Sequence, residues 1–383
     1  MNETKRNAIY PLSGDPMHYG HLYNIETAAK TGFFDRIYVA MGINSKKKYL
    51  FDTKEREELA KRTIAPLGLD NVVIESFEGL LAHYAYERNA PIIIRGARKG
   101  NDFDYEKAIS DFNNQYGLQT FIIPSSNAVE GISSTMVKEI ISGGGLVQEY
   151  VHPSVKQTLE EKILGVSVVG VTGNMGAGKS YYCHELAKQA AEKGIPMIHY
   201  DADKIIHALY NEGGSAHPWL YNAMKDTFGE EVCKAGKINR KALSEVVFGN
   251  EKSAEKLKEI LAVPFRIEFE KALKQTKGIL LFDAAYLTEY NLLGWANYNV
   301  MLVGCEESER RKRVWERDRI DTAKFDKVAK LQMTYEGIKK KILEEQGKVR
   351  YGFLYEVSSG KQDYDADLEF LKSKLNIRPV NGG

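Results

Sequence analysis

About halfway along the chain the sequence reads Gly173-Asn174-Met175-Gly176-Ala177-Gly178-Lys179-Ser180, a complete G-x-x-x-x-G-K-S motif. The motif follows an apolar run at 166–171 and precedes a helix-compatible stretch at 181–191. In such a strand–loop–helix unit backbone N–H groups surround phosphates, the lysine reaches the β/γ-phosphates and the serine hydroxyl reaches Mg²⁺. A glycine-rich turn before a helix is the alternative, but a chance match to the whole motif is on the order of one in a hundred. The sequence therefore predicts a site for ATP or GTP.

The composition is that of an ordinary globular chain. Its 383 residues are 43% hydrophobic and 27% charged, which predicts two or three domains. A net charge of +1 points to neither nucleic acid nor a membrane surface as partner. Cys183, Cys233 and Cys305 lie far apart and fit neither a disulfide framework nor a zinc motif. With no signal-peptide core at the start and no apolar run long enough for a membrane span, we predict a cytoplasmic protein.

The first part of the chain alternates short apolar strands with amphipathic helices. Strands are expected at 8–10, 36–41, 72–75, 91–94 and 120–123, and helices at 21–30, 52–64, 80–88 and 105–116. This alternation predicts a doubly wound parallel α/β sheet. The pattern changes near residue 165, so two domains are expected, 1–164 and 165–383.

Polar residues follow several of these strands, at the edge of the sheet where ligands of such folds bind. His18 and His21 come after the first strand, Lys46 to Lys48 after the second, Arg95 and Arg98 after the fourth, and Ser133 to Thr135 near the fifth. Each group has a second interpretation: helix capping for the histidines and the hydroxyls, and a solvated turn for the lysines. Their shared position favours a site for a phosphorylated ligand.

These motifs resemble two enzyme families. His18-x-Gly20-His21 with Ile132-Ser133-Ser134-Thr135-x-x-Lys138 is similar to the signature pair of the HxGH nucleotidyltransferases. Phe51-Asp52-x-x-Glu55-Arg56, Arg95-Gly96-x-Arg98 and Asp102-Phe103-x-Tyr105-Glu106 resemble phosphopantetheine adenylyltransferase of the bacterial type. After the phosphate loop, Asp201-Ala202-Asp203, Gly236-Lys237-Ile238-Asn239-Arg240 and Arg313-x-x-x-Arg317-Asp318 resemble dephospho-coenzyme A kinase. Together they resemble a bifunctional coenzyme A synthase, which implies a Rossmann-like nucleotidyltransferase fold followed by a P-loop, nucleoside-monophosphate-kinase-like fold, each a three-layer α/β/α domain.

For the first domain the resemblance implies attack by the phosphate of 4′-phosphopantetheine on the α-phosphorus of ATP. His21 then donates to the α-phosphate and Lys47 contacts both substrates. The implied phosphopantetheine-binding residues are Ser13, Lys47, Leu80 and Arg95. The implied ATP-binding residues are Ser13, Gly14, His18, His21, Gly96, Arg98, Glu106, Ile132, Ser133, Ser134 and Thr135.

For the second domain the resemblance implies transfer of the γ-phosphoryl group of a second ATP to the ribose 3′-hydroxyl of dephospho-coenzyme A. Asp201 and Asp203 follow an apolar strand at 196–200, where one of them accepts the hydroxyl proton or holds Mg²⁺ through water; capping of the next helix is the alternative. Asp283 ends a second strand at 279–282 and is a further carboxylate on the acceptor side or the Mg²⁺ side of the site, with a helix cap as the alternative. Lys179 is the implied catalytic lysine, and Ser180 the implied Mg²⁺ ligand. The implied ATP-binding residues are Asn174, Met175, Gly176, Ala177, Gly178, Lys179, Ser180, Tyr181 and Arg317.

The chain departs from the family patterns at several positions. Leu12 and Gly14 stand where a glycine and an aromatic are usual, residues 127–131 lack aromatics, and Val263 and Ala285 replace a histidine and a proline.

Two alternatives to this function therefore stay open. One is another adenylyltransferase, such as the NMN type, fused to a nucleoside or nucleotide kinase, and the other is a fusion with one regulatory, inactive domain. The expected partners are ATP, 4′-phosphopantetheine and dephospho-coenzyme A, with no nucleic acid and no membrane. The sequence leaves a homo-oligomer open.

Overall fold

The computed structural model describes residues 6–43, 48–97, 110–248, 250–319, 325–327, 329 and 332–376. It divides into two compact units, Met1–Leu159 with Gln346–Tyr351, and Glu160–Glu345 with Gly352–Gly383. The domain boundary expected at 164/165 stays a prediction. In the part of the chain that the structure describes, no helix is both long and apolar enough to cross a membrane.

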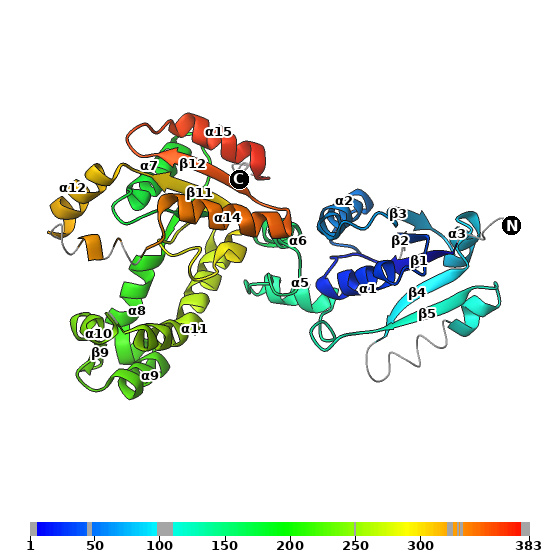
Figure 1. Cartoon of the computed structure of the whole chain (residues 1–383), viewed down its shortest axis with the longest axis horizontal. Coiled ribbons are helices and arrows are strands. Elements are labelled where there is room, and N and C mark those ends of the chain that lie inside the picture. The colour runs from blue at the N-terminus through cyan, green and yellow to red at the C-terminus, as the bar shows by residue number, and fades with distance from the viewer. Residues whose placement is uncertain are drawn as a thin grey trace. The chain divides into compact units, whose positions relative to one another are not determined.

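The first unit is built on a five-stranded parallel sheet in the order β3-β2-β1-β4-β5 (Figure 1). The strands are β1 (Asn7–Leu12), β2 (Arg36–Ile43), β3 (Val72–Glu78), β4 (Ile92–Ala97) and β5 (Gln119–Pro124). All five expected strands are present, and the doubly wound parallel fold is confirmed. Their ends differ from the prediction, most importantly at β4, because its pairing with β5 continues through Arg95 and Gly96. These two residues therefore lie within the strand and do not follow it.

The helices of this unit are α1 (Tyr19–Lys30), α2 (Thr53–Ile64), α3 (Leu81–Glu87), α5 (Ser134–Ser142) and α6 (Pro153–Leu159). Helix α2 begins where it does because the Asp52 carboxylate accepts from the Glu55 amide at 2.8 Å while the Glu55 carboxylate accepts from the Asp52 amide at 2.8 Å. The helix expected at 105–116 lies partly outside the described residues, and 110–114 are helical. Buried apolar residues on both faces of the sheet, among them Ile9, Ile93 and Ile94, form the core.

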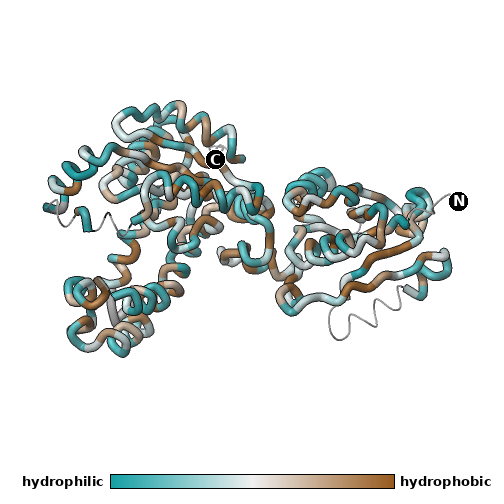
Figure 2. Tube along the Cα trace, in the orientation of Figure 1, coloured by the Kyte–Doolittle hydropathy of each residue, from teal (hydrophilic) through white to brown (hydrophobic). Residues whose placement is uncertain are grey.

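The second unit contains another five-stranded parallel sheet, in the order β12-β11-β6-β10-β7. Its strands are β6 (Val166–Thr172), β7 (Met197–Asp201), β10 (Gly278–Asp283), β11 (Asn299–Gly304) and β12 (Phe353–Ser358). The central strand β6 is buried along its whole length, as expected of a parallel sheet covered on both faces. Strands of both sheets carry much of the hydrophobic colouring in Figure 2. The phosphate loop connects β6 to α7 (Lys179–Glu192), which confirms the predicted strand–loop–helix unit.

The other helices of the second unit cover the sheet or extend from it. Helices α8 (Ala202–Ala216), α9 (Pro218–Phe228), α10 (Arg240–Val247) and α11 (Glu251–Gln275) gather, with the small hairpin β8 (Cys233–Lys234) and β9 (Lys237–Ile238), around an apolar cluster of their own (Figure 1). Helix α12 (Glu307–Asp318) follows β11, α14 (Tyr335–Val349) precedes β12, and α15 (Tyr364–Lys374) follows it.

Candidate active sites

A cleft opens in the first unit where β1 and β4 end and α1 begins. It brings together five of the predicted substrate-binding residues: Ser13, His18, His21, Arg95 and Gly96. Among the described residues its lining is Tyr10, Pro11, Leu12, Ser13, His18, Gly20, His21, Asn24, Arg95, Gly96, Ser125 and Val129.

Several other predicted residues are not in this lining. Lys47, Arg98 and Glu106 lie outside the described residues. Gly14 is buried and has a φ of +61°, a backbone conformation that favours glycine. Leu80 is 47% exposed at the start of α3, and Ile132 is buried.

His18 and His21 cap the start of α1 with each other's help. The Nδ1 of His18 accepts from the Gly20 amide at 3.1 Å, and the Nδ1 of His21 accepts from the His18 amide at 3.3 Å. Their rings stack with centroids 3.7 Å apart, and His18 is buried. Because each Nδ1 accepts a hydrogen bond, each neutral ring carries its hydrogen on Nε2. Capping and ligand binding are therefore compatible interpretations: the cap fixes the tautomer that presents an N–H donor at a helix N-terminus.

The three hydroxyls at the start of α5 have different surroundings. Ser133 is the N-cap, its hydroxyl accepting from the Met136 amide at 3.1 Å. The Ser134 hydroxyl donates to the Pro16 carbonyl at 2.8 Å, which ties α5 to the turn before α1. Thr135 is exposed. The capping interpretation is thus correct for Ser133, and the ATP contacts of the three residues stay predictions.

Asp15 is a residue of this site that the sequence analysis did not recognise as important. Its carboxylate is 1% exposed and accepts from the Phe51 amide at 2.9 Å, the Leu50 amide at 3.0 Å and the Lys138 ammonium at 2.9 Å. Burial raises the pKa of this carboxyl, but Lys138 and the two amides lower it by more, so its pKa lies below its usual value. Asp15 therefore stays ionised and joins three separate segments around the cleft.

Arg56 holds the ends of two strands in place. Its guanidinium is 1% exposed and donates to the Ser13 carbonyl at 2.7 Å and to the Gly42 carbonyl at 3.2 Å. The guanidinium also stacks on the Tyr49 ring, 4.1 Å from its centroid. The carboxyl ends of β1 and β2 are therefore fixed by one buried cation, and a family motif that includes an arginine was its only signal in the sequence.

Asn24 and Gly96 meet at the base of the cleft. The side-chain Nδ2 of Asn24 donates to the Tyr10 hydroxyl at 3.1 Å, and among the described residues nothing donates to its buried Oδ1. A Cβ on residue 96 would lie 2.0 Å from Asn24 Nδ2, so only glycine fits there with this asparagine in place. Asn24 was not predicted from the sequence, because it stands on an amphipathic helix without any recognisable motif.

In the second unit the phosphate loop and its lysine form the second site. Gly178 precedes α7 with a φ of +92°, and Gly173, with a φ of +149°, lies against the Val303 carbonyl, where a Cβ would be 2.3 Å away. The Lys179 ammonium donates to the Gly173 carbonyl at 3.0 Å. Desolvation lowers the pKa of the Lys179 ammonium. The negative charges of Asp283 and Asp203 oppose this shift, and the positive charge of Arg317 adds to it. Arg317 therefore lies close enough to act on the same charge.

Three carboxylates face this loop. Ser180 donates to Asp283 Oδ2 at 2.6 Å, and β10 pairs with β7 so that Asp283 stands opposite Asp201. Asp201 accepts from the Lys204 amide at 3.0 Å and so caps α8, which begins at Ala202. Asp203 is an exposed residue, but partial desolvation of its carboxyl raises the pKa of this group. The negative charges of Asp201 and Asp283 raise this pKa further, and the positive charge of Lys179 lowers it.

Helix α12 packs directly on the phosphate loop. Arg310 donates to the Met175 carbonyl at 2.9 Å, and a Cβ on Gly176 would lie 2.8 Å from the Arg310 carbonyl. Arg313 donates to the Ser359 hydroxyl at 2.7 Å and to the Ala177 carbonyl at 3.4 Å. The arginines on this face of α12 therefore satisfy loop carbonyls, a role that the composition of the helix could not locate.

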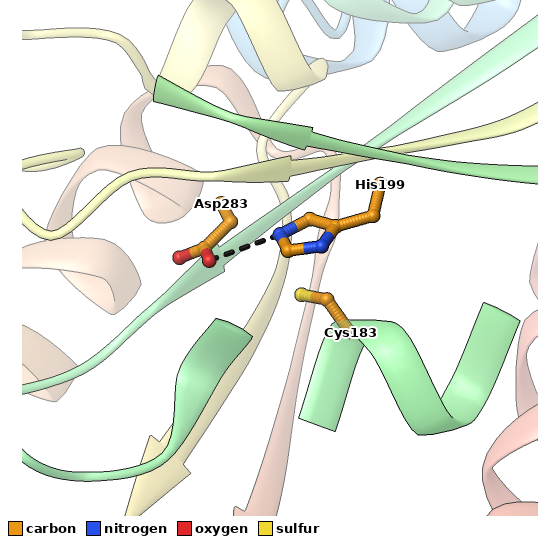
Figure 3. A group of neighbouring side chains, drawn as sticks. All are labelled: Cys183, His199 and Asp283. Atoms are coloured by element: carbon orange, nitrogen blue, oxygen red, sulfur yellow. Dashed lines mark hydrogen bonds and ion pairs between the residues drawn. The ribbon is translucent and has the colours of Figure 1, made fainter. Parts of the chain in front are cut away.

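Two residues that the sequence analysis did not place in this site adjoin Asp283. His199 Nε2 lies 3.1 Å from Asp283 Oδ2, and the Cys183 thiol of α7 lies nearby (Figure 3). Burial raises the pKa of the Cys183 thiol well above its usual value, and the Asp283 charge adds to this. No short motif signals the group, since its members come from α7, β7 and β10.

A second hollow in this unit lies among α8, α10 and α11. Asp203 is on its edge, and Arg240 donates to His207 Nε2 at 2.6 Å within it. Desolvation lowers the pKa of His207, and the Arg240 charge adds to this. The rest of the lining is largely apolar: Ile206, Tyr210, Leu243, Ser244, Val247, Phe248 and Leu257. Its chemistry suits an acceptor with both anionic and apolar parts.

Fold and sites together define an α/β transferase with a nucleotidyltransferase-type site in one unit and a P-loop kinase-type site in the other. Family models match both parts, Cytidylyltransferase-like at residues 13–140 and Dephospho-CoA kinase at residues 167–345. The phosphopantetheine adenylyltransferase of Streptomyces coelicolor is 40% identical over 159 residues, 41% of this chain and 98% of the relative. That of Pseudarthrobacter chlorophenolicus is 42% identical over 156 residues, 40% of this chain and 92% of the relative.

The chain belongs to the phosphopantetheine adenylyltransferase family through its first part, and its second part carries a dephospho-CoA kinase domain. The solved dephospho-CoA kinase of Campylobacter jejuni is 17% identical, with 54% of this chain and 95% of that chain covered and a TM-score of 0.30, which is too weak a likeness to add to this assignment.

Proposed function

We propose that this chain catalyses the last two steps of coenzyme A biosynthesis. The first step joins ATP and 4′-phosphopantetheine to give dephospho-coenzyme A and diphosphate. The second transfers the γ-phosphoryl group of another ATP to the ribose 3′-hydroxyl of dephospho-coenzyme A. The single observation that carries the proposal is that one chain contains a domain of each family, the product of one being the substrate of the other.

In the first step a phosphate oxygen of 4′-phosphopantetheine attacks the α-phosphorus of ATP, and the bond from that phosphorus to the bridging oxygen of diphosphate breaks. Negative charge accumulates on the α-phosphate oxygens, so the site needs donors and cations and no nucleophilic side chain. His21 supplies an Nε2–H held by its cap, the N-terminus of α1 supplies its dipole, and Arg95 supplies a cation from β4. Lys47 is the proposed contact to both substrates.

In the second step the ribose 3′-hydroxyl attacks the γ-phosphorus and ADP leaves. Lys179 offsets the charge of the β- and γ-phosphates, and Arg317 adds a second cation near it. We favour Asp203 over Asp201 as acceptor of the hydroxyl proton, because Asp203 borders the acceptor hollow while Asp201 is bonded to the Lys204 amide.

Mg²⁺ is the proposed cofactor of this second site. The Ser180 hydroxyl and the Asp283 carboxylate lie 2.6 Å apart and are hard oxygen donors, which suits Mg²⁺. Bound there with ATP, the ion would neutralise charge on the β- and γ-phosphates. We also propose a cytoplasmic location and small-molecule partners only. Neither alternative left open by the sequence is favoured by an observation at the sites.

Incubation of the purified chain with 4′-phosphopantetheine, ATP and Mg²⁺, followed by mass spectrometry, tests this function. We expect dephospho-coenzyme A to appear first and coenzyme A after it. Nicotinamide mononucleotide offered in place of 4′-phosphopantetheine is the control for the NMN-type alternative and should give no product. A chain that stops at dephospho-coenzyme A, or that makes none but phosphorylates it when supplied, would have one inactive domain and would refute the proposal.

A further inference from the structure

Cys183, His199 and Asp283 converge at the inner side of the phosphate-loop site (Figure 3). One ligand atom from each lies within 4.8 Å of the other two, and His199 Nε2 lies 3.1 Å from Asp283 Oδ2. Cys183 and Asp283 are buried, while the His199 side chain is 14% exposed and offers the access. The group is not an acidic surface cluster, because it combines a thiol, an imidazole and a single carboxylate.

A thiolate, an imidazole and a carboxylate are the ligands that Zn²⁺ takes, at bond lengths of about 2.0–2.3 Å. In a tetrahedral site such bonds place neighbouring ligand atoms about 3.3–3.8 Å apart. His199 and Asp283 are already near that separation, and Cys183 reaches it with a side-chain movement of about 1 Å. Mg²⁺ prefers oxygen ligands and does not compete for the sulfur. We propose that these three side chains bind one Zn²⁺ ion, and that the ion inhibits the kinase step.

Binding displaces the thiol proton of Cys183 to solvent and uses the lone pair of one ring nitrogen of neutral His199. Asp283 completes three protein ligands, and a fourth position is open to water. The Asp283 oxygen that now accepts from Ser180 at 2.6 Å also lies 3.1 Å from His199, so coordination draws this carboxylate away from Ser180. Because Ser180 and Asp283 form the phosphate-loop side of the kinase site, Zn²⁺ and a productive ATP complex exclude each other. The adenylyltransferase site shares none of these residues.

Binding is tested with Co²⁺, whose thiolate complexes absorb in the near ultraviolet while its nitrogen and oxygen complexes do not. Titration of the full-length chain should develop this band at one equivalent, and Zn²⁺ should remove it. Cys183→Ser and Cys183→Ala should both lack the band. Cys233→Ser and Cys305→Ser are matched controls elsewhere in the second unit and should keep it. A band that survives in both Cys183 variants, or no band in the parent chain, overturns the site.

Inhibition is tested with S-methyl dephospho-coenzyme A as acceptor, because a free substrate thiol would itself bind the metal. At constant Mg²⁺, free Zn²⁺ at about 10 to 100 times the dissociation constant found in the cobalt competition should lower the kinase rate about 10- to 100-fold. The Cys183→Ser variant should keep its basal rate and lose the inhibition. The adenylyltransferase rate, measured with a thiol-blocked 4′-phosphopantetheine, should not respond. Undiminished kinase activity despite a cobalt band refutes the inhibitory role. Only this second test rests on the proposed kinase function, so a cobalt band with no kinase activity before Zn²⁺ is added would refute that function and leave the metal site standing.

Discussion

Replacement of His21 separates two roles of one ring, the helix cap that the structure shows and the proposed contact to the α-phosphate of ATP. Its Nδ1 accepts from the His18 amide at 3.3 Å and completes the cap of α1, while its Nε2–H faces the cleft in the proposed reaction. His21→Ala removes both interactions. His21→Gln keeps an acceptor at this position of the capping box, since glutamine is a natural residue there. The pair of variants is therefore a matched test of structure against chemistry.

The expected magnitudes differ enough to separate the two effects. Loss of a helix cap costs about 1 kcal/mol of stability. Loss of a donor whose bond strengthens as charge builds on the α-phosphate costs about 3–4 kcal/mol, roughly a hundredfold to a thousandfold in kcat. An interaction made mainly in the transition state changes ATP affinity far less. In His21→Gln the side-chain oxygen forms the cap and its amino group points along a different line from the ring N–H, so stability should return and the rate should stay low.

Steady-state kinetics of both half-reactions and thermal unfolding of both variants decide between these outcomes. The kinase step, supplied with dephospho-coenzyme A, should proceed near the parent rate and serves as the internal control. An alanine variant that forms dephospho-coenzyme A at full speed would refute the role of His21. A glutamine variant that recovers both stability and rate would show that the cap alone matters.

Three further changes probe other contacts. Lys179→Ala should slow the kinase step about a hundredfold or more and make dephospho-coenzyme A accumulate, as followed by mass spectrometry, while its formation rate is unchanged; an equal loss in both steps would contradict separate sites. Gly96→Ala would place a Cβ 2.0 Å from Asn24 Nδ2 and should cost about 1–3 kcal/mol in unfolding experiments, a loss that added Asn24→Ala should largely remove. The folded-state pKa of Asp15 lies below its ordinary 3.8, so its contribution to stability is present above about pH 3.8 and is lost as the pH falls through the folded value. The free energy of unfolding, measured against pH, should therefore fall on acidification, and it should fall less in Lys138→Met, which lacks the ammonium that Asp15 contacts.

Local sequence patterns were enough to predict the secondary-structure elements and the chemistry that depends on neighbouring residues. The five strands of the first unit and the strand–loop–helix around Lys179 follow from local hydrophobic periodicity and glycine spacing, and all are present. The histidine pair could also be located, because its three-residue spacing makes a recognisable motif. Its tautomers could not be predicted, since they depend on which amide meets each ring nitrogen once α1 has formed.

Contacts between distant segments could not be predicted in this way, because they form only when the whole chain has folded. Arg95 and Gly96 lie inside β4 because β5 pairs with them, and pairing is not visible in the sequence of either strand. Asp15 meets Lys138 across 123 residues. Likewise, Cys183, His199 and Asp283 come together only because β7 and β10 are neighbours in the sheet beside α7. Such groupings depend on strand order and on the direction of each side chain, which the whole fold determines and no local pattern encodes.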